Sequence, residues 1–156
     1  DDFVSSRQKT AEAITSQIKN IPYIKPPTVM NECTHGYYMY PMILDIDNIG
    51  LSRNIIKKAL EAEGVQGLAE GYINIHRYPM YQNKIAYGKN GFPWSSSICK
   101  RDISYEKGIC PVAERLQDST YLAFENCDWD LSKEDIELFG NAFNKVFSQL
   151  DSLKKI

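Results

Sequence analysis

The chain has 156 residues, 43% of them hydrophobic and 24% charged, which fits one globular domain over 1–156 and excludes a disordered chain. The formal net charge of −2, with 18 Lys and Arg scattered among 20 Asp and Glu, excludes the basic footprint of a nucleic-acid-binding protein. The longest apolar runs are only a few residues, far short of the roughly 20 that a spanning helix needs, so we expect no membrane segment.

The cysteines and the amino terminus indicate where the protein occurs and whether the chain is whole. No cysteine belongs to a Cys-x-x-Cys pair or stands at zinc-finger spacing from His35 or His76; the four are Cys33, Cys99, Cys110 and Cys127. We therefore expect no metal site, and free thiols in a cytoplasmic protein. The chain starts at Asp1 in helix-like sequence without a leader, and we interpret it as a piece of a longer protein.

Apolar residues recur every three or four positions at the start of the chain and predict a leading helix over 1–21, ended by Pro22. An extended connector over 22–27 follows, because proline disfavours helix before itself. Residues 37–46 are rich in aromatic and branched side chains and predict a strand. Pro41 cannot donate a ladder hydrogen bond, so we expect that strand to be at an edge or bulged there.

Ser52 predicts the cap of a second helix that runs to about Glu63 and stops at Gly64. Its inward face is expected to hold Ile55, Ile56, Ala59 and Leu60. Further strands are expected near Val65 and over 72–75, which gives a β-α-β order.

Between 76 and 109 the periodic pattern fails, and glycines, prolines and serines alternate with six aromatic residues. A loop of this length inside a compact domain is usually functional or mobile. Because the aromatic side chains need cover, we expect this long aromatic loop to pack against a surface that the chain itself lacks.

The last third predicts a short helix that starts at Pro111, a strand over 121–124 and a closing helix over 131–154 with a Ser132–Asp135 capping box. Both terminal helices carry continuous apolar stripes, so they are expected to pack together. The predicted fold is α+β, a small and mainly antiparallel sheet of three or four strands with helices packed on one face.

Several motifs occur in a fixed order along almost the whole chain: HGYYMYP at 35–41, Ser52-Arg53, GYINIH at 71–76, PMY at 79–81, CPVAERL at 110–116 and LSKEDI at 131–136. This succession resembles the C-terminal small domain of the DegT/DnrJ/StrS-type aminotransferases, PLP-dependent enzymes of fold type I that act on keto-sugars or keto-cyclitols. The sequence departs from many relatives at Asn74-Ile75, where they have Pro-Leu, and at Glu125-Asn126, where they have a proline. These departures leave the substrate subgroup open.

The resemblance implies an amino donor such as glutamate or glutamine, a homodimer, and PLP held by an N-terminal large domain. A cofactor lysine segment and a glycine-rich phosphate loop are both missing from this sequence. We therefore expect no catalytic, cofactor-binding or metal-binding residue in this chain, no PLP bound to it alone and no activity of the piece by itself.

The resemblance places His76 at the edge of the substrate pocket, where its ring could hydrogen-bond a sugar hydroxyl or phosphate. Arg77, Tyr72 and Tyr81 are the other expected substrate-binding residues. The plainer interpretations are a loop histidine that is satisfied locally, a solvated arginine and aromatic packing of the loop. Another class of protein also stays open, a stand-alone α/β ligand- or protein-binding module without catalytic activity.

Overall fold

The computed structural model describes residues 2–88, 90–126 and 130–155, so Cys127 lies outside the described residues. The chain forms two compact units, Asp1–Gly71 with Ser119–Ile156 and Tyr72–Asp118. The first unit contains α1 (Asp2–Ile18), β1 (Ile24–Lys25), β2 (Tyr40–Leu44), α2 (Ile46–Ile49), α3 (Arg53–Ala62), β3 (Leu68–Ala69), β4 (Tyr121–Phe124), α6 (Lys133–Ser148) and α7 (Leu150–Leu153). The second contains η1 (Ile75–Arg77), α4 (Pro79–Gln82) and α5 (Pro111–Arg115), and the π-helical turn η2 (Leu116–Thr120) crosses the boundary.

The first unit is built on a four-stranded sheet in the order β1-β2-β4-β3, with every neighbouring pair antiparallel. The expected α+β class with a small antiparallel sheet is confirmed. β2 is an inner strand, so the expectation of an edge strand is wrong for β2 as a whole. β1 pairs only with Ile43 and Leu44, however, so no β1 residue stands beside Pro41, where a donor is missing.

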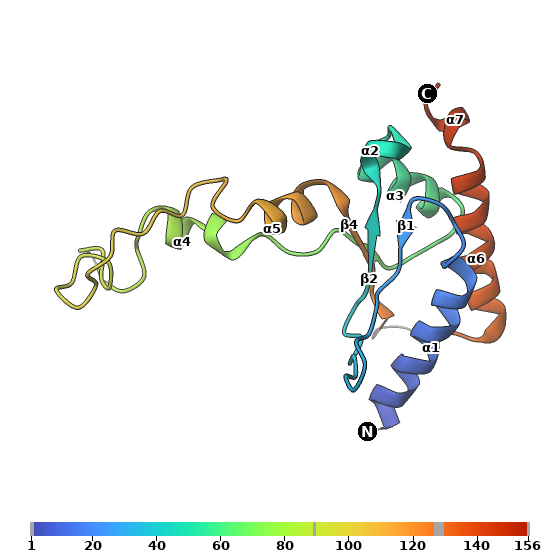
Figure 1. The fold of residues 1–156 in the computed structure, drawn as a ribbon, viewed down its shortest axis with the longest axis horizontal. Helices are drawn as coiled ribbons and strands as arrows, with labels where there is room; N and C mark the ends of the chain where they lie inside the picture. The colour runs from blue at the N-terminus through green and yellow to red at the C-terminus, as the bar shows by residue number, and fades with distance from the viewer. Residues whose placement is uncertain (1, 89, 127–129, 156) are drawn as a thin grey trace. The chain divides into compact units, whose positions relative to one another are not determined.

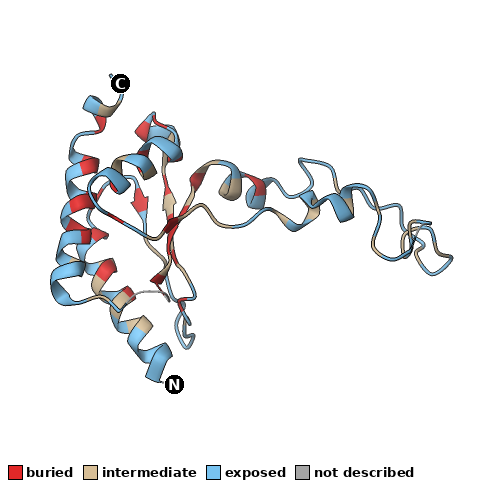
Figure 2. Ribbon diagram, turned by 180° about the vertical axis from the view of Figure 1, so that it is seen from behind, coloured by how far each residue is buried: buried red, intermediate tan, exposed pale blue. Residues whose placement is uncertain are grey.

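The core of this unit lies between the sheet and the helices α1 and α6, which lie side by side (Figure 1). Tyr40, Met42 and Leu44 alternate inward along β2, and Figure 2 shows the buried residues gathered on this unit. Phe124 and three phenylalanines of α6 continue the core as a row of ring contacts: Phe139, Phe143 and Phe147. The expected packing of the opening helix on the closing one is thus observed.

Gly140 makes the approach of α1 and α6 possible. A Cβ atom at this position would stand 2.8 Å from the Cβ of Gln17 on α1, closer than real Cβ contacts. A mid-helix glycine costs about 1 kcal/mol relative to alanine, so close helix packing accounts for a residue that helix propensity disfavours.

The terminal helices differ from their expected bounds. α1 ends at Ile18 rather than at residue 21, because the backbone turns there and Tyr23 adopts a φ of 70° before entering β1. The closing helix starts after Ser132, whose capping box with Asp135 is confirmed, but it breaks at Gln149 into α6 and α7.

Within α3 the buried face also differs from the expected one. Ser52 caps the helix, and Gly64 has a φ of +94° just after its end, as expected. Ile56 and Leu60 point inward, whereas Ile55 is exposed. The buried face starts at Arg53, three residues before Ile56, and its guanidinium donates to the Tyr121 carbonyl and to Glu70.

The remaining strands were misplaced. The expected strand near Val65 is the two-residue β3 at Leu68–Ala69, because the Val65 N–H closes α3 by bonding to the Leu60 carbonyl. The expected strand over 72–75 is wrong: Gly71 turns the backbone at a φ of 79°, and the segment runs into the 3₁₀ turn η1. Two residues of the expected connector, Ile24 and Lys25, form β1 instead.

The second unit has no apolar core of its own in the described residues. Glu114 is the one buried residue among the described part of Tyr72–Asp118. Twelve large apolar side chains are exposed there: Tyr72, Ile73, Ile75, Tyr78, Met80, Ile85, Tyr87, Phe92, Ile98, Ile103, Ile109 and Val112. In the described residues, no helix combines the length and apolar character that crossing a bilayer requires.

Candidate functional site

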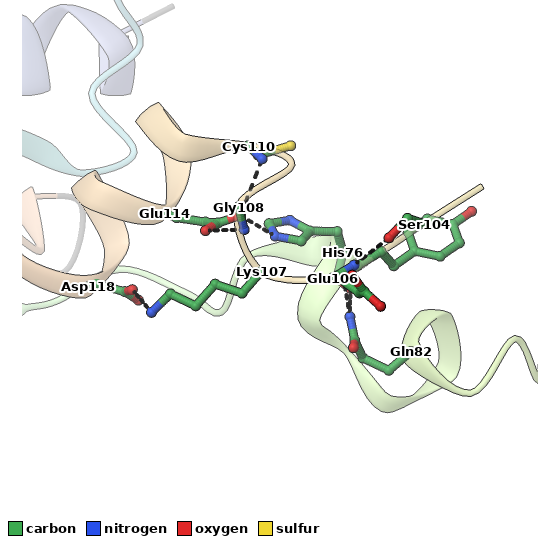
Figure 3. A network of polar contacts seen from close by, with 10 residues as sticks. His76, Gln82, Ser104, Glu106, Lys107, Gly108, Cys110, Glu114 and Asp118 are labelled. Atoms are coloured by element: carbon green, nitrogen blue, oxygen red, sulfur yellow. Dashed lines mark hydrogen bonds and ion pairs between the residues drawn. The ribbon is translucent and has the colours of Figure 1, made fainter.

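Glu114 organises a polar network in the second unit (Figure 3). It lies in α5, which begins with Pro111 at its first position, as expected. Its carboxylate accepts hydrogen bonds from the Gly108 N–H at 2.8 Å and from the Cys110 N–H at 3.2 Å. Gly108 has a φ of +105°, a conformation that favours glycine, and this conformation carries the chain into the contact.

His76 completes the network from η1, with its ring Nε2 2.9 Å from the Glu114 carboxylate. Burial raises the pKa of Glu114, but the hydrogen bonds from Gly108, Cys110 and His76 outweigh it and hold the pKa below its usual value. The carboxylate is therefore ionised at neutral pH and can only accept hydrogen bonds. It follows that His76 Nε2 carries the proton, which leaves Nδ1 as the second polar atom of the ring.

The backbone around His76 is held by Gln82, at the end of α4. The Gln82 side-chain amide donates to the His76 carbonyl at 2.6 Å and also to the Tyr105 carbonyl. Only 10% of the His76 side chain is exposed, with Glu114 buried beside it. The local partner proposed for a structural histidine is thus present, together with one ring nitrogen, Nδ1, that bonds to no other described residue.

The other three expected site residues have different surroundings. Tyr81 packs in an aromatic cluster with Trp94 and Tyr105, and the Trp94 indole N–H donates to the Tyr105 hydroxyl at 3.0 Å. Tyr72 is 63% exposed, and Arg77 is exposed as well. The structure therefore links Tyr81 to His76 through Gln82 and Tyr105.

Glu114 was missed as a site residue. Its signal in the sequence is a carboxylate in the first turn of a helix that Pro111 starts, with Gly108 and Cys110 as possible N–H donors just before it. That pattern identifies an acceptor for helix-start N–H groups, but only the fold brings His76 to it across 38 residues.

His35 and the cysteines are the other residues considered above as possible metal ligands. His35 Nδ1 accepts from the Tyr37 N–H at 2.9 Å, and the two rings are in contact, which is a structural role beside β2. Within the described ranges, no group of three or more His, Cys, Asp and Glu side chains could hold a metal ion. Cys33, Cys99 and Cys110 are free thiols.

Each unit contains a hollow among its described residues. The first, of about 460 Å³, lies among apolar side chains of α6, Phe124 and Val65, with Glu63 and Lys145 at its rim. The second, of about 480 Å³, lies in the loop between Asn83 and Asp102. None of the four expected substrate-binding residues lines either hollow.

The lysines of the described residues do not fit a Schiff base with PLP. Such a lysine needs a desolvated or charge-activated amine inside a site. Here Lys57 and Lys84 are half-buried, the other described lysines are exposed, and Lys89 lies outside the described residues.

A sequence model of the DegT/DnrJ/EryC1/StrS aminotransferase family matches residues 1–115. Two curated proteins are similar. The uncharacterized protein MJ1066 of Methanocaldococcus jannaschii is 24% identical over 77% of this chain and 30% of that protein. The spore coat polysaccharide biosynthesis protein SpsC of Bacillus subtilis is 27% identical over 67% of this chain and 27% of that protein.

Solved structures agree with the fold. The aminotransferase TlmJ from Streptoalloteichus hindustanus superposes with a TM-score of 0.60 at 18% identity, over 95% of this chain and 32% of that one. The 3-amino-5-hydroxybenzoic acid synthase gives 0.66 at 12% identity, over 96% and 35%. The chain thus spans about a third of the length of the proteins it matches. It belongs to the DegT/DnrJ/EryC1/StrS aminotransferase family.

Proposed function

We propose that this chain is the C-terminal small domain of a PLP-dependent aminotransferase that moves an amino group from glutamate or glutamine to a keto-sugar or keto-cyclitol. The family match over residues 1–115, in a chain about a third as long as its relatives, carries this proposal. PLP, when bound, supplies the electron sink for transamination. Its lysine belongs to an N-terminal large domain, and the whole protein is a homodimer.

In this proposal His76 contacts the substrate and Glu114 is a positioning residue. The Glu114 carboxylate holds the ring through Nε2–H, so Nδ1 is the ring atom left to hydrogen-bond a sugar hydroxyl. Tyr81, Tyr72 and Arg77 contribute to the substrate side of the pocket from the same unit. An ionised, buried carboxylate fixes the ring more firmly than a neutral partner would.

The exposed apolar residues of the second unit support the presence of a further domain. Twelve exposed large apolar side chains in the described part of this unit exceed what scattered surface residues explain, and such side chains are typical of surfaces that dock on protein. In the whole enzyme they pack against the large domain.

An open reading frame with about 200 or more codons upstream, encoding a lysine-bearing domain, is the first test; a frame that starts at Asp1 would contradict the proposal.

The role of His76 is tested in the whole enzyme. His76→Ala is expected to lower turnover about fivefold to thirtyfold, which corresponds to the loss of about 1 to 2 kcal/mol of hydrogen bonding to substrate. PLP retention, measured by the absorbance of the bound cofactor, should stay unchanged. His35→Ala, the other histidine, is the matched control and should turn over within about threefold of wild type. Equal losses of turnover and of PLP, or loss of neither, would show the role to be wrong.

A further inference from the structure

The hollow in the loop of the second unit has a cationic wall. Lys84, Lys100 and Arg101 line it together with one acid, Asp102. Lys84 pairs with Asp102 at 2.9 Å. Across the described ranges, Lys100 and Arg101 have no ion-pair partner, so the wall carries an excess of two positive charges.

The charge of the surrounding sequence favours the same sign. The segment 72–118 contains seven Lys and Arg against four Asp and Glu, a formal charge of +3. The rest of the chain contains eleven against sixteen, a charge of −5. Because like charges close together cost free energy, a positive segment in an acidic chain points to a negatively charged ligand.

The walls of the hollow are held in place by contacts inside the loop. Trp94 is fixed by its indole hydrogen bond to Tyr105 and by edge-on ring contacts with Tyr81 and Tyr105. The Ser95 hydroxyl donates to the Asn90 carbonyl at 2.5 Å. The backbone of Gly91 lies near that of Lys84, since a Cβ at Gly91 would be 3.4 Å from the Lys84 carbonyl oxygen.

We infer that this hollow binds the phosphate group of a ligand. A guanidinium offers paired donors that match phosphate oxygens, and lysine ammonium groups add point charges. The volume of about 480 Å³ lies within the range of small-molecule sites. Under the proposed function, on which this part rests, the ligand is a phosphorylated acceptor rather than a free cyclitol. Its phosphate would lie beside Trp94, which Tyr105 and Gln82 connect to His76.

The test is calorimetric titration of pyrophosphate into the whole protein saturated with PLP, at about 50 mM salt, where screening is weak. The double variant Lys100→Gln/Arg101→Gln should bind at least tenfold more weakly than wild type. The control Lys9→Gln/Lys58→Gln removes the same charge from exposed positions on α1 and α3 and should bind as wild type does. No binding to wild type, or equal weakening in both doubles, would overturn the inference.

Two further measurements are needed. One identifies the kind of molecule that carries the phosphate, and the other tests the proposed function independently of this inference. Uridine diphosphate that binds at least tenfold tighter than pyrophosphate supports a nucleotide-linked ligand, and equal binding supports recognition of the phosphate alone. The glutamate-dependent change in cofactor absorbance needs no acceptor and should survive in the Lys100/Arg101 variant. If that change is present without pyrophosphate binding, only this inference fails. If pyrophosphate binds in the hollow without that change, only the proposed function fails.

Discussion

Different interactions stabilise the interiors of the two units. The first buries apolar side chains from every layer, with Tyr40, Phe143 and Leu122 fully covered. The second buries one carboxylate and leaves its large apolar residues at the surface, within the described residues. The first unit therefore carries the driving force for its own folding, whereas the conformation of the second is defined by hydrogen bonds, ion pairs and a small cluster of rings.

The comparison also separates two kinds of aromatic residue. In the first unit aromatic rings fill a core, as Phe139 does by stacking on Phe143 at 4.5 Å. In the second, Tyr81, Trp94 and Tyr105 form a small cluster of half-buried rings. A segment rich in aromatic residues is thus not by itself evidence of a hydrophobic core.

The largest expected difference is in amide exchange of the 156-residue chain. Amides of α1, α6 and β4 should exchange about a thousandfold more slowly than those of 76–109, because few buried contacts oppose opening of the loop. Hydrogen exchange followed by mass spectrometry measures both regions at once. Uniformly strong protection across 76–109 would contradict the view that this loop needs an external surface.

Matched phenylalanine truncations sharpen the comparison. Phe143→Ala removes a fully buried ring and should lower the free energy of unfolding by about 3–5 kcal/mol. Phe92→Ala removes a ring that is 46% exposed and should change it by about 0.5 kcal/mol or less. Urea unfolding of both variants gives the two values. A large loss for Phe92→Ala would mean that the loop contributes to the core after all.

A smaller effect distinguishes the units by pH. The pKa of Tyr40 is raised to about 12, mainly because the hydroxyl is buried. The hydrogen bond with the Thr15 hydroxyl lowers this pKa somewhat, and electrostatic repulsion from Tyr37 raises it. Since the folded pKa lies above the unfolded one, this stabilisation is complete below pH 10 and is lost as pH rises towards 12. Urea unfolding at pH 8 and pH 11 should show the loss in wild type and a smaller one in Tyr40→Phe. An identical loss in the variant would assign it to other groups.

The acid side tests the second unit. Folding lowers the pKa of Glu114, so its carboxylate stabilises the folded second unit. That stabilisation is fully present above the ordinary pKa of a glutamate and is lost as the pH falls through the pKa of the folded state. The Gly108 and Cys110 amides should therefore lose protection at acid pH while amides of α6 keep it. If they lose protection at neutral pH in wild type, the network is not formed.

The sequence predicted best where local chemistry decides the structure. The strand over 121–124 and the Ser132 capping box were predicted correctly, since strand propensity and capping act over a few residues. Helix phase was less certain: branched Ile55 is exposed, while Arg53 is buried because a backbone carbonyl and Glu70 satisfy it. Burial of a charge depends on partners that lie far away in sequence.

The candidate site was predictable only in part for the same reason. His76 was identified by resemblance, but its pairing with Glu114 joins two segments that no local pattern connects. The strand expected over 72–75 failed because apolar content does not by itself provide a neighbouring strand to pair with. The role of His76 in binding substrate stays a prediction.

The scarcity of buried apolar surface in the second unit has a thermal consequence. Exposure of apolar groups dominates the heat capacity of unfolding, which curves the stability of a protein with temperature. The described part of Tyr72–Asp118 releases little such surface when it opens, so its opening equilibrium should vary almost linearly with temperature. Cooling, which weakens apolar association, should then lower the stability of the sheet unit by more than it changes the hydrogen bonds between the Glu114 carboxylate and its three donors.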